Sequence, residues 1–245
     1  MTAGPKYGEF GRFSTTYDAA RPPMPSEVLD YLASRTNLQN VLDVGCGTGI
    51  ITRQIHRLGI PVSGSDIDEE MIRTARAYND GINYAVAPAE QLPFADASFN
   101  TVTCFSAFHW FANEKAAGEI RRVLVPGGHV FIANREYGKF REGFLQVLRP
   151  FIEGDIPNIK ASYEPEILLE ACGYADIDKK TLTVTESLSD SEALSYVLST
   201  SVWNIIPEDK KQLAKNELHA YFKSIAIDNQ VLRPTEIRTV LAQSK

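Results

Sequence analysis

The hydrophobic positions of this chain fall into short apolar runs separated by amphipathic segments. Residues 41–44 are a run typical of a buried strand, and Ile51, Ile55 and Leu58 give the next segment the apolar face of a helix. Further strands are predicted over 63–66, 82–86, 101–105 and 129–133, and further helices over 26–34, 68–78 and 113–124. Strands that alternate with helices predict an α/β fold with a mainly parallel sheet.

The pattern changes after Tyr137. Amphipathic helices are predicted over 140–151 and 165–172, from a capping box that begins at Ser189, and from Pro207; strands are predicted around 177–184 and over 235–241. The chain contains no recognisable linker, so we predict a single domain over 1–245. Its predicted parts are an N-terminal flap (1–24), a cofactor-binding core (25–135), the C-terminal part of the sheet with a lid helix (136–188 and 229–245), and an inserted helical lid (189–228).

Three glycines at alternate positions, Gly45, Gly47 and Gly49, lie between the first strand and a helix that we expect to begin near Thr48. Glycine allows a positive φ and lets a ligand approach the backbone, and a helix N-terminus offers unpaired N–H groups. Asp66 closes the second strand twenty-one residues after Gly45. An acid meets a ribose hydroxyl at about this spacing, ~20 residues, in nucleotide-binding βαβ units.

Asp43 decides between two kinds of nucleotide. A dinucleotide site needs a third glycine at position 50, which is Ile50, and Asp43 would repel a pyrophosphate. The same carboxylate would attract an ammonium group, and S-adenosylmethionine (SAM) has an ammonium group, a ribose and no phosphate. A nicotinamide-dependent oxidoreductase is therefore disfavoured, and an ordinary glycine-rich turn is the remaining structural alternative.

The run from Asp43 to Gly49 resembles motif I of the class I SAM-dependent methyltransferases. The resemblance implies S-adenosyl-L-methionine as the cofactor. It also implies a Rossmann-like, seven-stranded, mostly parallel sheet with helices on both faces and a helical lid. The loop 87–94 is similar to the adenine loop of that family, where Ala89 and Glu90 match and Pro88 replaces the usual acid.

The segment before the first helix is similar to the lead-in of many small-molecule methyltransferases, on the run from Tyr17 through Arg21 to Pro25. The resemblance implies that Tyr17 and Arg21 lie over the methionine part of SAM, with Arg21 near its carboxylate. Packing of the aromatic flap, which includes Tyr7, Phe10 and Phe13, against the core is the alternative. The predicted cofactor contacts are Tyr17, Arg21, Asp43, Gly45, Cys46, Gly47, Gly49, Asp66, Ile67, Ala89, Glu90 and Phe105.

The segment after the fourth strand is expected over the transferable methyl group, because ligands of open α/β sheets sit beyond the carboxyl ends of the strands. Its sequence, from Ala107 to Phe111, is similar to the His-Trp signature of the trans-aconitate and juvenile-hormone-acid methyltransferases, which methylate a carboxylate oxygen. By that resemblance His109 and Trp110 are the catalytic candidates. A carboxylate needs only their N–H groups for orientation, whereas a hydroxyl acceptor needs His109 as a base. Packing against the following helix is the structural alternative.

Composition narrows the choice of partners and compartment. The net charge is −6, and the one basic pair, Arg121-Arg122, is interpreted as a solvated helix face, so nucleic acid is not expected as a partner. No apolar run approaches the ~20 residues of a membrane span, and the first residues lack the apolar core of a signal peptide. Three cysteines are an odd number and are widely spaced, so neither a disulfide framework nor a metal site is predicted.

Together these features predict a cytoplasmic, SAM-dependent methyltransferase that acts on a small-molecule acceptor, with a carboxylate oxygen as the favoured target. Methylation of a hydroxyl, phenol or carbon is the alternative reaction. A SAM-binding protein without catalysis is the alternative outside enzymes. The acceptor, the oligomeric state and the pathway stay open at this stage.

Overall fold

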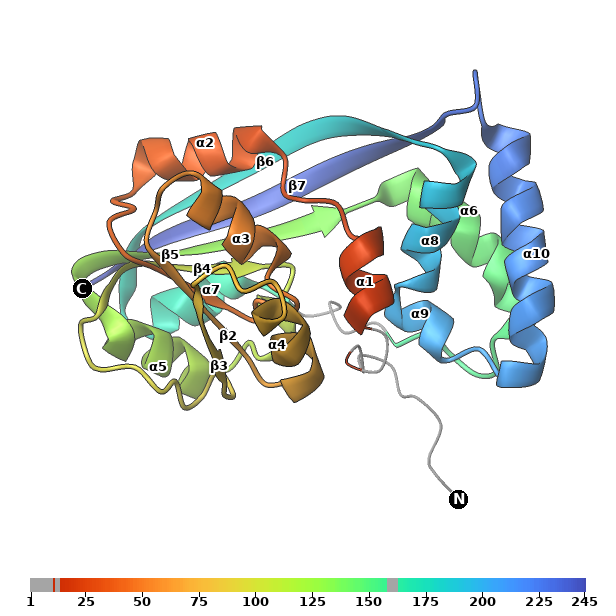
Figure 1. Ribbon diagram of the computed structural model, residues 1–245. Helices are drawn as coiled ribbons and strands as arrows, with labels where there is room; N and C mark the ends of the chain where they lie inside the picture. Colours follow the sequence, from red (N-terminus) through yellow and green to blue (C-terminus); the bar gives the residue numbers. More distant parts are fainter. Residues whose placement is uncertain (1–10, 12–13, 158–162) are drawn as a thin grey trace. The chain divides into compact units, whose positions relative to one another are not determined.

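The computed structural model describes residues 11, 14–157 and 163–245. Tyr7, Phe10 and Phe13 of the predicted flap lie outside the described residues. The chain divides into two compact units, each drawn in Figure 1. The sheet unit takes the described residues of 22–135, 159–182 and 237–245, and the helical unit takes those of 1–21, 136–158 and 183–236.

A seven-stranded sheet has the strand order β3-β2-β1-β4-β5-β7-β6. The strands are β1 (Val41–Val44), β2 (Val62–Asp66), β3 (Asn83–Val86), β4 (Phe99–Phe105), β5 (Leu124–Glu136), β6 (Tyr174–Leu188) and β7 (Val231–Ser244). The pairs β1–β2, β1–β4, β2–β3 and β4–β5 are parallel. The predicted fold class, a mostly parallel seven-stranded sheet with helices, is confirmed.

Helices cover both faces of the sheet, as the side-chain alternation of β5 shows. The ring of Phe131 lies 6.3 Å from that of Tyr31 on α2 (Ser26–Arg35), measured between centroids. Its neighbours Val130 and Ile132 point the other way, because successive residues of a strand face opposite sides. They pack in the apolar cluster that α5 (Glu114–Val123) and α7 (Pro165–Ala171) help to build.

The helices that follow β1 and β2 differ slightly from their predicted bounds. α3 (Ile50–Arg57) begins two residues after Thr48, because Gly49 is its left-handed N-cap at φ 78°. It ends before Leu58, which is 61% exposed, so the prediction that Leu58 belongs to the buried face was wrong. α4 (Glu69–Arg76) begins at the predicted N-cap, where the Asp68 carboxylate accepts two backbone N–H groups.

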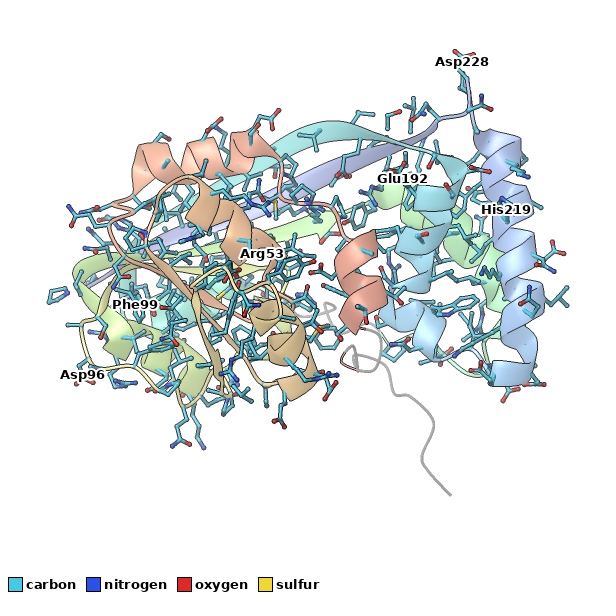
Figure 2. The ribbon with its side chains drawn as sticks, viewed as in Figure 1. Arg53, Asp96, Phe99, Glu192, His219 and Asp228 are labelled. Atoms are coloured by element: carbon cyan, nitrogen blue, oxygen red, sulfur yellow. The ribbon has the colours of Figure 1, made fainter. Side chains whose placement is uncertain are left out.

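The helical unit has an aromatic core of its own. Its helices are α1 (Ser14–Ala20), α6 (Gly138–Leu148), η3 (Arg149–Phe151), α8 (Asp190–Leu198), α9 (Ser201–Asn204) and α10 (Glu208–Ile225). The rings of Phe140 and Phe222 stack at 5.7 Å, which joins α6 to α10. The predicted capping box of Ser189 and Glu192 is present at the start of α8, where Figure 2 labels Glu192. This unit is larger than the lid predicted over 189–228, since α1 and α6 belong to it.

The Pro126-Gly127-Gly128 segment lies inside β5, which begins at Leu124, whereas the predicted strand begins at residue 129. Phe99 of β4 pairs with Leu124, and Thr101, two residues on, pairs with His129. The extra residues of β5 form a bulge, which the positive φ of Gly127 (74°) allows. None of the helices in the described part of the chain is long and apolar enough to cross a bilayer.

Arg122 of α5 holds the loop between β3 and β4, so its interpretation as part of a solvated face was wrong. Its guanidinium donates to the carbonyl oxygens of Leu92 (3.0 Å) and Phe94 (2.9 Å) and pairs with Glu119 (2.7 Å) and Asp96 (2.6 Å). Asp96 lies on this loop, as Figure 2 shows. The neighbouring Arg121 is exposed and donates to two carbonyls at 3.1 and 3.3 Å.

We expect Arg122→Lys to lower the free energy of unfolding by about 1–2 kcal/mol, because an ammonium group cannot reproduce the forked contacts of a guanidinium. Arg121→Lys is the matched control and should cost less than about 0.5 kcal/mol. Urea unfolding of both variants measures the difference. Equal stabilities for the two variants would contradict the assigned role of Arg122.

Candidate cofactor and active site

The glycine turn joins the carboxyl ends of β1 and β2. The backbone N–H groups of Gly45 and Cys46 both donate to the Ser65 carbonyl, at 2.7 and 3.0 Å. The N–H of Gly47 donates to the Asp66 carboxylate at 2.8 Å. Arg53, labelled on α3 in Figure 2, donates to the Thr48 carbonyl at 2.6 Å, which ties the turn to the helix.

The three glycines of the turn are needed for different reasons, although all have positive φ (72°, 56° and 78°). A Cβ at Gly45 would collide with the Cβ of Ala107, and a Cβ at Gly49 would lie 2.5 Å from the Tyr84 hydroxyl. A Cβ at Gly47 would meet nothing within 4 Å. Gly45 and Gly49 therefore serve packing, and Gly47 is the glycine that faces open space where a ligand can approach.

Asp43 lies beneath this turn and is only 2% exposed. Its two carboxylate oxygens accept from the hydroxyls of Thr52 on α3 (2.7 Å) and Thr103 on β4 (3.0 Å). Burial raises the pKa of Asp43 to about 7, against the opposing effect of the two hydroxyls. A carboxylate has lone pairs beyond those two hydrogen bonds, so Asp43 can accept a further one. The predicted contact between Asp43 and an ammonium group stays a prediction.

Asp66 is half-buried at the end of β2, and both of its carboxylate oxygens accept hydrogen bonds from backbone N–H groups. One oxygen accepts from Gly47 and the other from the N–H of Asp68, at 2.8 and 2.9 Å. Burial raises the pKa of this carboxyl too, while the backbone bonds oppose the rise. Ile67 follows and is 71% exposed, so an apolar side chain stands beside the carboxylate predicted to meet a ribose.

Other predicted cofactor contacts also belong to the sheet unit. Ala89 is buried, and the Glu90 carboxylate accepts from the Asn113 amide at 2.8 Å, at the N-cap of α5. Phe105 is buried and its ring lies 5.9 Å from that of Phe131. Burial raises the pKa of the Cys46 thiol well above its usual range, so the thiol is an unreactive part of the turn.

His109 lies in the 3₁₀ helix η2 (Phe108–Trp110), directly after β4. Its Nδ1 is 3.3 Å from Oδ1 of Asn134, which is buried near the end of β5. The other side of the Asn134 amide, Nδ2, donates to the Tyr163 hydroxyl at 3.1 Å. Because Nδ2 is the donor toward Tyr163, Oδ1 accepts the proton on Nδ1, and Nε2 is the nitrogen that the amide does not occupy.

The η2 segment abuts the glycine turn. Ala107 and Phe111 lie on either side of η2, and their side chains are the ones that a Cβ at Gly45 would meet. Ser106 has φ 53°, a left-handed conformation that turns the chain sharply out of β4. Trp110 is 42% exposed and its ring lies 5.1 Å from that of His109. The two catalytic candidates therefore lie at the same sheet edge as Asp43 and Asp66.

Tyr17 and Arg21 belong to the helical unit, whereas the glycine turn belongs to the sheet unit. The Arg21 guanidinium lies 4.8 Å from the Tyr17 ring and 4.9 Å from the Tyr196 ring. Their predicted position over the methionine part of SAM stays a prediction.

Sequence analysis missed Thr52, Thr103, Asn134 and Tyr163. Thr52 precedes the buried Ile55 by three residues, so it lies on the inner face of α3, and Thr103 is a polar position inside an apolar strand. Asn134 is a polar residue near the carboxyl end of a strand, where ligands of such sheets gather. Tyr163 carries no signal in the sequence, because it comes from a loop far along the chain.

Part of the sheet unit is similar to known methyltransferases. Residues 42–132 match the family model described as a methyltransferase domain. An uncharacterised methyltransferase of Schizosaccharomyces pombe is 26% identical over 216 residues, which are 85% of this chain and 85% of that protein. The malonyl-[acyl-carrier protein] O-methyltransferase of Erwinia pyrifoliae is 35% identical over 136 residues, 54% of this chain and 52% of that protein.

A solved structure shows the same fold. Phosphoethanolamine N-methyltransferase 2 of Haemonchus contortus, in complex with S-adenosyl-L-methionine, aligns with a TM-score of 0.55 at 20% identity. The alignment covers 96% of this chain and 57% of that one. The Rossmann-like methyltransferase fold is thereby confirmed. The resemblance to the trans-aconitate and juvenile-hormone-acid subgroup stays a prediction.

We expect Gly49→Ala to destabilise the protein by about 2–4 kcal/mol, since the new methyl group combines a positive φ with a collision against Tyr84. Gly47→Ala should cost about 1 kcal/mol, because its methyl group meets only the unfavourable φ. Thermal unfolding of the ligand-free proteins compares the two variants. A Gly47→Ala protein as unstable as Gly49→Ala would show that Gly47 does not face open space.

Proposed function

We propose that this chain, whose residues 42–132 match the model of a methyltransferase domain, uses SAM to methylate a carboxylate oxygen of a small molecule. The observation that carries the proposal is the pairing of His109 with Asn134 at the sheet edge that holds the glycine turn. The chemistry that SAM supplies is a methyl group activated by its sulfonium. The protein then has to hold the cofactor, align the acceptor and exclude water.

The glycine turn and β2 offer what SAM needs. The open space at Gly47 admits a ligand close to the backbone, Asp66 offers a carboxylate for the ribose hydroxyls, and Ile67 offers an exposed apolar side chain for the adenine. The buried charge of Asp43 favours a cationic group above it. These features suit a ligand with an ammonium and no phosphate.

His109 is the residue that would hold the methyl acceptor. Nδ1 of His109 donates to Asn134, so Nε2 is the nitrogen proposed to meet the acceptor. A carboxylate held at Nε2 favours the protonated imidazole, and the resulting N–H donates to one oxygen while the other attacks the methyl group. No proton has to be removed from a carboxylate. The name of the Erwinia relative, an O-methyltransferase of a malonyl group, supports this target.

The same geometry supports a second candidate. A neutral His109 with its proton on Nδ1 presents a lone pair at Nε2, which is the correct form for removing a proton from a hydroxyl or phenol. The two candidates differ in the role of His109, as a hydrogen-bond donor or as a base, so they differ in which acceptors are methylated.

We expect transfer of a labelled methyl group from SAM to one or more members of a panel of organic acids. His109→Ala should lower kcat/KM by about 10²-fold, because one positioned donor is lost. Asn134→Ala should lower it by about tenfold, since the imidazole is no longer oriented. His56→Ala, an exposed histidine on α3, is the matched control and should leave the rate unchanged.

The choice of acceptor separates the candidates. For a carboxylate acceptor, members of the panel of organic acids should be methylated, while phenols and alcohols should not. Methylation of phenols or alcohols with acids left untouched would contradict the carboxylate proposal and favour a base. Transfer that is unaffected by His109→Ala would remove that residue from the site.

Asp43 predicts the pH dependence of cofactor binding. Its carboxyl is protonated below pH about 7 in the free protein, and an ammonium ligand favours the ionised form. The affinity for S-adenosylhomocysteine should therefore fall as pH decreases below about 7, by up to about tenfold per pH unit. Calorimetry between pH 5.5 and 8.5 measures the slope.

Asp43→Asn is the control for that slope. It should bind S-adenosylhomocysteine weakly at every pH, and any slope that is left belongs to Asp66. The raised pKa of Asp43 means that ionising it costs stability as pH rises from its unfolded value toward about 7. At pH 8 the ligand-free variant should therefore be more stable than wild type, by about 1–3 kcal/mol. A variant with unchanged affinity would contradict the role of this charge.

A further inference from the structure

Three polar side chains from separate segments of the sheet unit form a chain of hydrogen bonds. His109 follows β4, Asn134 lies on β5, and Tyr163 precedes α7. Nδ1 of His109 is 3.3 Å from Oδ1 of Asn134, and Nδ2 of Asn134 donates to the Tyr163 hydroxyl at 3.1 Å. The Asn134 amide therefore links the hydroxyl of Tyr163 to the catalytic candidate His109.

The backbone holds Asn134 beside η2. Ala133, the residue before it, is the last residue of β5 that pairs with β4, and its carbonyl accepts from the N–H of Ser106 at 2.7 Å. Asn134 is only 5% exposed, so both ends of its amide need partners inside the protein. Those partners are His109 at the oxygen end and Tyr163 at the nitrogen end.

The orientation of this amide decides which nitrogen of His109 carries a proton. A side-chain amide can turn by about 180° and exchange its oxygen and nitrogen at nearly the same positions. With Oδ1 toward His109, the ring must have a proton on Nδ1. With Nδ2 toward His109, Nδ1 must be bare, and the proton of a neutral ring then lies on Nε2.

Tyr163 acts on the amide from its nitrogen end. Its hydroxyl oxygen accepts from Nδ2, which leaves Oδ1 facing His109, and a turned amide would need the phenol to donate instead. Burial raises the pKa of Tyr163, so the phenol stays neutral and keeps its lone pairs for this bond. The Tyr163 ring also packs on η2, with its centroid 5.9 Å from the His109 ring and 6.4 Å from the Phe108 ring.

We propose that Tyr163 is a positioning residue, which keeps a proton on Nδ1 of His109 by fixing the orientation of the Asn134 amide. Both forms of His109 considered above, the doubly protonated donor to a carboxylate and the neutral base toward a hydroxyl, have Nδ1 protonated and direct Nε2 to the acceptor. The consequence for methyl transfer rests on the proposed function, whereas the position of the proton does not.

Nitrogen-15 NMR of the histidine-labelled, ligand-free protein reads the position of the proton directly. The ring signals of His109 are assigned by their loss in His109→Gln. At alkaline pH, where one ring nitrogen is protonated, wild type should show a protonated Nδ1 and a bare Nε2. Tyr163→Phe keeps the ring and removes the hydroxyl, so the ratio of the Nδ1–H form to the Nε2–H form should fall by about fivefold, as expected for one lost hydrogen bond.

Two further variants make the test specific. Tyr174→Phe is the matched control, because the Tyr174 hydroxyl donates to the Ala117 carbonyl at 2.9 Å in the same unit, and it should leave the His109 signals as in wild type. Asn134→Asp replaces the amide by a carboxylate, which accepts at both oxygens and holds the Nδ1 proton whichever way it faces. Adding Tyr163→Phe to Asn134→Asp should therefore leave the proton on Nδ1.

Several results would overturn the proposal. A wild-type His109 with its proton on Nε2 would show that the phenol donates to a turned amide. Signals that Tyr163→Phe leaves unchanged, or that Tyr174→Phe changes equally, would show that the Tyr163 hydroxyl does not select the form of His109. A proton that Tyr163→Phe still moves when Asn134 is replaced by Asp would show that the amide is not the link.

Methyl transfer is the second readout. With an acceptor that wild type methylates, Tyr163→Phe should lower kcat by about three- to tenfold and leave the KM for SAM unchanged, because the hydroxyl acts on His109 and not on the glycine turn. Tyr174→Phe should keep the wild-type kcat, and a kcat that Tyr163→Phe leaves unchanged would overturn the positioning role. A proton position that depends on Tyr163 in a protein that methylates no acceptor would reject the proposed function and keep this inference.

Discussion

The buried carboxylate of Asp43 is the constraint around which the sheet unit is arranged. It accepts from a hydroxyl on α3 and from another on β4, so one side chain joins the end of β1 to its two neighbours. Its charge is disfavoured by burial, and the hydroxyls offset only part of that cost. The ionised carboxylate of Asp43 is therefore most stable when a positively charged group binds at the glycine turn above it.

The glycine turn shows how packing and binding share one short segment. Gly45 and Gly49 allow η2 and Tyr84 to pack tightly against the turn, and Gly47 leaves the open approach. The close contact with Ala107 also brings η2, and with it His109, to the edge where the turn lies. Tight packing on one side of the turn therefore positions the catalytic candidate, and the absence of a side chain at Gly47 leaves room for a ligand.

The sequence predicted the architecture well because its signals are local. The alternation of strands and helices, the N-cap at Asp68 and the capping box at Ser189 each depend on a few neighbouring residues. The end of α3 and the bulge in β5 were missed, since both are decided by packing between strands and helices. Arg122 was misread because its loop partners Phe94 and Leu92 lie 28 and 30 positions before it in the chain.

The candidate site was predictable in part for the same reason. Asp43, Gly47, Asp66 and His109 stand in short motifs at the ends of strands, where a pattern can point to them. Asn134 and Tyr163 come from distant segments, and only the folded chain brings them to His109 and to each other.

A cationic ligand that binds at the glycine turn should favour the ionised form of the Asp43 carboxyl and so lower its pKa. Carbon-13 NMR of the Asp43 carboxyl, with and without S-adenosylhomocysteine, tests it directly. We predict a titration midpoint at pH about 7 in the free protein and one at least a full pH unit lower in the complex. A midpoint near the ordinary value of about 4 in the free protein, or one that the ligand leaves unmoved, would contradict the claim.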